Sequence, residues 1–112
     1  MAVMPRSSPF GSRSRTGVLL ALFLLGQSYP REMSRVLGTG LSAVQKALAG
    51  LERDGLVAGR TIGRTRVFTL NPRYFAAAAL RTYLARLAQP ESELERRVSA
   101  LRRRPRVTGK PL

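Results

Sequence analysis

An unbroken apolar run lies near the start of the chain. Residues 17–30 read GVLLALFLLGQSYP, and every residue in 18–25 is apolar. Arginines before the run and small residues after it are features of a secretory signal peptide. The alternative is a buried helix that is capped by Ser12 or Thr16 and closed by Gly26. Such a helix would be apolar nearly all round, so we expect it to contact a second subunit as well as its own core.

The apolar spacing after this run predicts two helices separated by a tight turn. Pro30 suits the first turn of a short helix. Gly-Thr-Gly at 38–40 then forms the turn, and a longer helix runs from about Leu41 to Asp54, followed by a C-cap glycine at Gly55. The apolar positions that share a face are Met33, Val36 and Leu37 in the first helix and Val44, Leu48 and Leu51 in the second.

Two short strands and two more helices complete the prediction. Residues 56–60 and 65–70 are rich in Val, Thr and Phe, and they form a hairpin with residues 61–64 at its tip. Asn-Pro then ends the second strand and opens a fourth helix over 73–87, and residues 91–104 form a fifth. The apolar stripe of the fourth helix consists of Phe75, Leu80, Leu84 and Leu87.

This order of elements predicts a mainly α fold with a small β-hairpin, an α+β class. Two helices joined by a short turn and followed by a hairpin form a winged helix-turn-helix. We expect residues 13–88 to make this domain, including its dimerisation helices. Residues 1–12 would be a flexible leader, 89–104 a C-terminal helix, and 105–112 a disordered basic tail.

The charge balance indicates a polyanionic partner. The chain has 20 Lys and Arg against 6 Asp and Glu, a formal net charge of +14. Such an excess favours nucleic acid first and an anionic membrane surface second. No apolar run approaches the roughly 18–20 residues needed to span a bilayer, so we expect no transmembrane helix.

The residue types present argue against catalysis and metal binding. The chain contains neither Cys nor His, which excludes thiol nucleophiles, histidine bases and Cys or His metal sites. Three of its six carboxylates lie together in the C-terminal helix, the other three show no paired geometry, and there is no phosphate-cradling loop. We therefore expect a protein that is not an enzyme and has no cofactor and no metal ion. The carboxylates are Glu32, Glu52, Asp54, Glu91, Glu93 and Glu95.

The segment from Met33 to Pro72 resembles bacterial ArsR-type and MarR-type winged-helix regulators. The resemblance is carried by SRVLGTGLSAVQKALAGLERDGLV followed by GRTIGRTRVFTLNP, and it extends over about residues 14–88. It implies that the apolar run at 18–25 is the helix on which the motif packs, and not a signal peptide. The chain departs from the metal-sensing ArsR relatives because it has no Cys or His, so metal sensing is not expected.

The resemblance and the pattern together predict a sequence-specific regulator of transcription that binds double-stranded DNA. The helix over 41–54 would enter the major groove, and the hairpin over 56–70 would reach the minor groove or the backbone. A glutamine can contact adenine, a lysine a phosphate or guanine, and a small residue lets the helix sit close. The expected DNA contacts are Ser42, Ala43, Gln45, Lys46, Arg60, Arg64 and Arg66.

We expect a cytoplasmic, nucleoid-associated repressor that acts as a homodimer. The dimer would place two recognition helices in successive major grooves of a pseudo-palindromic site. Its apolar surface would come from the first and fourth helices. The candidate residues are Leu19, Leu22, Phe23, Tyr83, Leu84 and Leu87.

Two other functions fit parts of the pattern. A winged-helix antitoxin or adaptor that binds a partner protein, such as a toxin-like nucleotidyltransferase, would also use an all-round apolar first helix. RNA binding by the same basic surface is less favoured, because single-strand readers usually expose aromatic platforms and most of the seven aromatics here suit the core.

Overall fold

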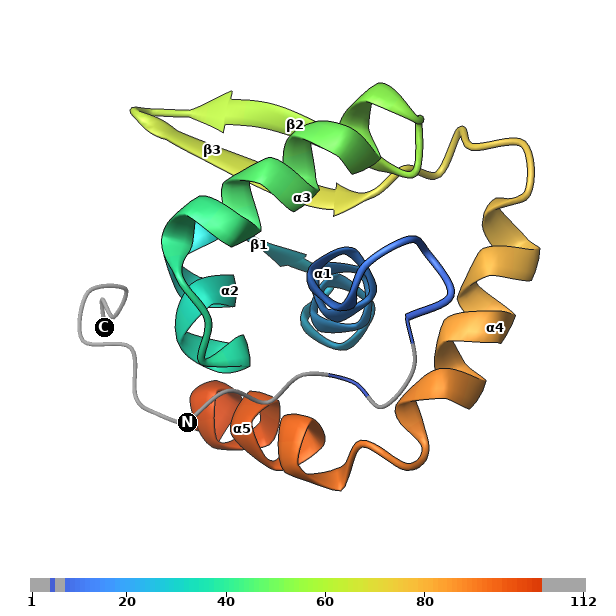
Figure 1. Cartoon of the computed structure of the whole chain (residues 1–112). Helices are drawn as coiled ribbons and strands as arrows, with labels where there is room; N and C mark the ends of the chain where they lie inside the picture. Colours follow the sequence, from blue (N-terminus) through green and yellow to red (C-terminus); the bar gives the residue numbers. More distant parts are fainter. Residues whose placement is uncertain (1–4, 6–7, 104–112) are drawn as a thin grey trace.

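The structure surrounds one helix with the rest of the chain (Figure 1). This computed structural model describes Pro5 and residues 8–103. The elements, in order, are α1 (Arg13–Leu25), β1 (Gln27–Ser28), α2 (Pro30–Leu37), α3 (Leu41–Arg53), β2 (Val57–Ile62), β3 (Thr65–Leu70), α4 (Ala77–Ala88) and α5 (Ser92–Arg103). The predicted class, α+β and mainly helical, is confirmed.

Helix α1 is the centre of the core. It contacts α2, α3, α4, α5 and both β1 and β3, and Figure 1 shows it end-on with these elements around it. Seven consecutive residues, Thr16 to Leu22, are buried. The apolar circumference of α1 is therefore satisfied within one chain, and it does not require a second subunit or a partner protein.

This burial corrects part of the predicted dimer surface. Leu19, Leu22 and Leu84 are fully buried among the chain's own residues, so they cannot form a contact between two copies. The physical reason is that α4 and α5 fold back onto α1 and cover it. Phe23 and Leu87 are half-buried, and Tyr83 is 45% exposed.

The predicted start and end of α1 are confirmed. The hydroxyl oxygen of Ser12 accepts a hydrogen bond from the Arg15 backbone N–H at 3.1 Å, which satisfies one of the free donors of the first turn. Gly26 closes the helix with a φ of 88°, in the region that glycine adopts without a steric penalty.

A short strand that the sequence did not predict follows α1. Gln27 and Ser28 form β1, which pairs antiparallel with β3 at Thr69 and Phe68. The sheet order is therefore β1-β3-β2, and β3 is its central strand. Ser28, which precedes the second helix, is buried in this strand, and its hydroxyl donates to Glu32 at 2.6 Å.

The connection between β3 and α4 differs from the prediction. The side chain of Asn71 donates to the Gly55 carbonyl at 2.9 Å and accepts from the Arg73 backbone N–H at 3.0 Å. These bonds hold the chain in turns, so α4 begins at Ala77 and not near residue 73. Phe75 lies outside the helix and is 93% exposed, where a place in the apolar stripe was expected.

The two ends of the described chain pack onto the same core. α5 contacts α1 and α2 and buries Leu94 and Val98, so it is part of this core and not a separate appendage. Within the predicted leader, Pro5 is buried, and the Phe10 ring lies 5.8 Å from the Tyr83 ring. The predicted tail at 105–112 lies outside the described residues. None of the described helices is long and apolar enough to cross a bilayer.

Candidate nucleic-acid interface

Helix α3 has one buried face and one polar face. The buried face packs against α1 and α2. On the polar face, Ser42, Gln45 and Lys46 are exposed, which is where the sequence spacing predicted them. Gly40 precedes α3 without a side-chain cap, so the first backbone N–H groups of this helix are not used by a capping side chain. The buried residues are Val44, Ala47, Leu48, Gly50 and Leu51.

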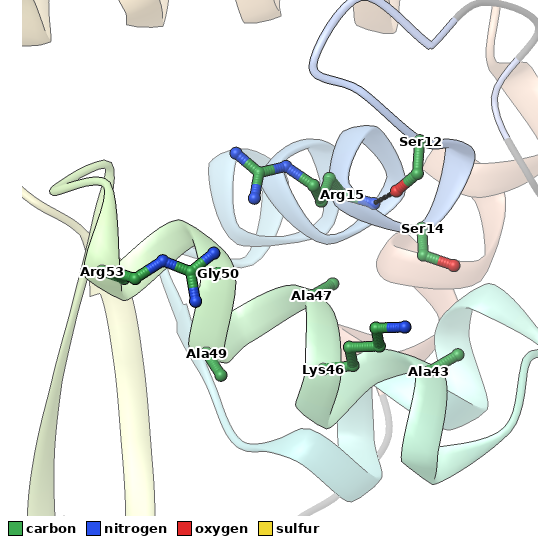
Figure 2. Close-up of a pocket in the computed structure, with 9 residues that line it drawn as sticks. All are labelled: Ser12, Ser14, Arg15, Ala43, Lys46, Ala47, Ala49, Gly50 and Arg53. Carbon is green, nitrogen blue, oxygen red and sulfur yellow. Dashed lines mark hydrogen bonds between the residues drawn. The ribbon is translucent and has the colours of Figure 1, made fainter.

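A cleft of about 510 Å³ lies between α3 and the first turn of α1 (Figure 2). Lys46 and Arg53 of α3 line it, together with Ser14 of α1. Ala43 also lines this cleft and is half-buried, so it is less accessible than an outward position would be. The cleft therefore adds the basic side chain of Arg53 and the hydroxyl of Ser14 to the polar face of α3.

A groove runs between α3 and the hairpin formed by β2 and β3. Two adjoining hollows of about 300 and 410 Å³ make it up, and both are lined by Pro30, Gln45 and Arg66. We call this the α3–hairpin groove. Its remaining lining residues are Tyr29, Arg31, Leu41, Leu48, Ala49, Glu52, Arg64, Thr65 and Phe68.

The hairpin turns more tightly than predicted. Ile62 pairs with Thr65, so the tip consists of Gly63 and Arg64 alone. Gly63 has a φ of 64°, which a two-residue hairpin turn commonly requires. Arg64 is therefore carried at the extremity of the hairpin and lines the same groove as Gln45.

The strand register places the other two hairpin arginines on opposite faces. Arg60 pairs with Val67, and both line a hollow with Ala58 on the face of the sheet away from α3. Arg66 immediately precedes Val67 on β3. Successive side chains of a strand point to opposite faces of the sheet, so Arg66 points toward α3. The three predicted hairpin contacts therefore have three different orientations.

Arg66 is engaged within the protein. Its guanidinium makes an ion pair with Glu52 of α3 at 3.0 Å and lies 4.9 Å from the centre of the Phe68 ring. It also lies beside Gly59, where an added Cβ would be 2.7 Å from the Phe68 ring. Among the charged residues predicted to contact DNA, Arg66 is the one that forms an ion pair within the described chain.

The described acidic residues leave this face strongly basic. Asp54 is paired with Arg15 at 2.8 Å, and Glu52 is paired with Arg66. The glutamates of α5 lie at the opposite end of the molecule from the hairpin in Figure 1. One of them, Glu93, has its pKa lowered by hydrogen bonds and charge from Arg96 and Arg97.

Several cations on the face have no ion pair within the residues the structure covers. They come from α2, α3 and the hairpin, and they surround the polar face of α3. They are Arg31, Lys46, Arg53 and Arg64.

Arg53 and Ser14 belong to this face but were not among the predicted contacts. Arg53 follows Lys46 by seven positions, which is two helical turns, so the same spacing that selected Lys46 would have found it. Ser14 has no such signal, because only the packing of α1 against α3 brings it to the cleft. In residues 5 and 8–103, no group of three or more potential metal ligands comes together.

No protein-family model matches this chain, and no curated protein is similar to it. The assignment of a function therefore depends on the geometry of the face described above.

Proposed function

We propose that this protein is a sequence-specific regulator of transcription that binds double-stranded DNA as a winged helix-turn-helix. The order α1-β1-α2-α3-β2-β3 supports this proposal, because it supplies a helix-turn-helix followed directly by a hairpin. The observation that carries it is the exposed polar face of α3, bordered by unpaired cations on both sides.

In this proposal α3 enters the major groove. Gln45 reads a base edge, since its amide can donate and accept at adenine, and Lys46 contacts a phosphate or guanine. The first turn of α3 adds backbone N–H groups and the positive end of the helix dipole. Ser42, on the same turn, bonds either a base or a phosphate.

The hairpin contacts the DNA through its tip. Arg64 reaches the adjacent minor groove or backbone, and Arg31 contacts a phosphate from the other side of the groove. Arg60 lies on the face of the sheet away from α3, so it is less suited to contact the bound DNA than was expected from sequence.

We further propose that the regulator is a homodimer whose contact surface differs from the one expected. Phe75 is 93% exposed and Tyr83 is 45% exposed, and both lie on or before α4. These rings and the half-buried Leu87 remain accessible after α1 is enclosed. Measurement of the mass in solution, with Phe75→Ser beside wild type, tests this: a dimer that the variant dissociates supports it, and a monomeric wild type contradicts it.

The DNA proposal is tested by titrating genomic duplex fragments at several salt concentrations. We expect tight binding to a subset of fragments, with an affinity that falls steeply as salt rises. Arg64→Ala should reduce the slope of log affinity against log salt by about one, whereas Gln45→Ala should change sequence preference more than the slope.

Arg86→Ala on the exposed face of α4 is the matched control, because it removes the same charge away from α3. It should leave sequence preference unchanged. Absence of binding to every fragment at low salt would contradict the proposal.

A further inference from the structure

The hairpin is attached to the core at its base and extends beyond it. Val57, Phe68 and Leu70 are buried at that base. Every residue from Arg60 to Arg66 is exposed, so the outer half contributes nothing to the hydrophobic core. Its position relative to α3 must therefore be set by other contacts.

Among the described residues, Arg66 makes the hydrogen bonds that join this outer half to α3. Its Nη2 donates to Oε2 of Glu52 at 3.0 Å, and its Nη1 donates to Oε1 at 3.5 Å. This two-point arrangement fixes direction as well as distance, because both the guanidinium and the carboxylate are planar. The side chains of Arg66 and Glu52 are 48% and 36% exposed.

Two neighbouring residues, Phe68 and Gly59, accommodate the guanidinium of Arg66. The ring of Phe68 lies under it at 4.9 Å, which favours the cation through the negative face of the ring. Gly59, on β2, leaves space for both groups, since a Cβ there would meet the Phe68 ring at 2.7 Å and the guanidinium more closely still. A lysine at position 66 would keep the charge but would lose the planar pairing.

We infer that Arg66 is a positioning residue, which together with Glu52 sets the separation between the reading helix α3 and the hairpin tip. This inference rests on the proposed function. It changes the role of Arg66 from a direct DNA contact to a residue that holds the hairpin against α3. Gln45, Arg64 and Arg66 line one groove. Arg66 also covers the Glu52 carboxylate, which would otherwise repel phosphates.

An exchange of the two charges tests this role. We expect Arg66→Glu to lower the ratio of specific to scrambled-duplex affinity by about tenfold, and Glu52→Arg to lower it as well. The double variant Glu52→Arg/Arg66→Glu rebuilds the pair with the same net charge. We expect it to recover that ratio to within about threefold of wild type, with an unchanged salt slope.

The matched control combines Glu52→Arg with Arg86→Glu, which has the same net charge but leaves Arg66 without a carboxylate partner. It should not recover specificity. A double variant at 52 and 66 that binds as poorly as Arg66→Glu alone, with a smaller salt slope, would overturn the inference, because Arg66 would then be a phosphate contact. Single variants that leave specificity unchanged would overturn it too.

A measurement without DNA separates this inference from the proposed function. Amide hydrogen exchange over residues 60–66 of the free protein should be about two- to fivefold faster in Arg66→Ala, as expected for loss of a half-exposed ion pair. Arg64→Ala should leave it unchanged. Equal exchange rates in wild type and Arg66→Ala would overturn the positioning role of Arg66. Absence of duplex binding by wild type would overturn only the proposed function.

Discussion

Helices α1 and α3 have the same length of thirteen residues but opposite environments. α1 is enclosed by helices and strands on every side, whereas α3 buries one face and presents the other to solvent. Both cross the same small core. The difference shows that an apolar circumference can be satisfied by later segments of one chain, whereas the polar stripe of α3 stays exposed to solvent.

The strongest test of this comparison is a cavity in α1. Leu19→Ala removes a fully buried side chain and should lower the free energy of unfolding by about 2–5 kcal/mol. Gln45→Ala, on the exposed face of α3, should change it by less than about 0.5 kcal/mol. Urea unfolding of both variants measures this contrast. A Leu19→Ala protein of normal stability would contradict the central place of α1 in the core.

A second test addresses the outward face of α3. Gln45→Ala should lose about 1–3 kcal/mol of discrimination at one base pair of the bound site, because in the proposed complex the amide pairs with one base edge. Lys46→Ala should weaken binding to all sequences alike if it contacts a phosphate. Selection of preferred sites from a random duplex pool distinguishes the two. A preferred site unchanged by Gln45→Ala would remove α3 as the reading helix.

A third test compares the first turns of the two helices. Ser12→Ala removes the side-chain cap of α1 and should cost about 0.5–2 kcal/mol of stability. Gly40 precedes α3 in an extended conformation with open space at its Cβ, so Gly40→Ser should gain about a few tenths of a kcal/mol. Thermal unfolding measures both the loss of stability expected for Ser12→Ala and the gain expected for Gly40→Ser. A loss on Gly40→Ser would show that the first turn of α3 cannot accept a cap.

The smallest expected effect concerns α5, which covers α1 but does not belong to the polar face. Hydrogen bonds from Arg96 lower the pKa of Glu93, so the ion pair stabilises α5 at neutral pH. That contribution is present above the ordinary pKa of a glutamate and is lost as the pH falls through the lowered value. NMR titration should show the pKa of Glu93 rising toward its ordinary value in Arg96→Gln. An unchanged value would mean that the pair does not form in solution.

The local elements were largely readable from the sequence. Gly26 marked the end of α1, Ser12 was one of two candidate caps for its start, and the spacing of Val44, Leu48 and Leu51 gave the phase of α3, because capping and periodicity are properties of neighbouring residues. The start of α4 was misjudged. The side chain of Asn71 reaches Gly55, sixteen residues earlier, and no local pattern contains that bond.

The candidate site was only partly readable. Exposure of Gln45 and Lys46 followed from the helical period, but the roles of the hairpin arginines did not. Arg60 and Arg66 look alike in sequence, and only the strand register and the approach of Glu52 separate them.

The sequence by itself therefore determined most of the helices and strands, with β1 and the start of α4 as the exceptions, and which face of α3 is polar, since these depend on contacts within a few residues. Tertiary structure decided what surrounds α1 and which cations remain unpaired. Those outcomes depend on α4, α5 and the hairpin folding back onto residues far away in the chain, and such packing follows from shape and burial that no short pattern records.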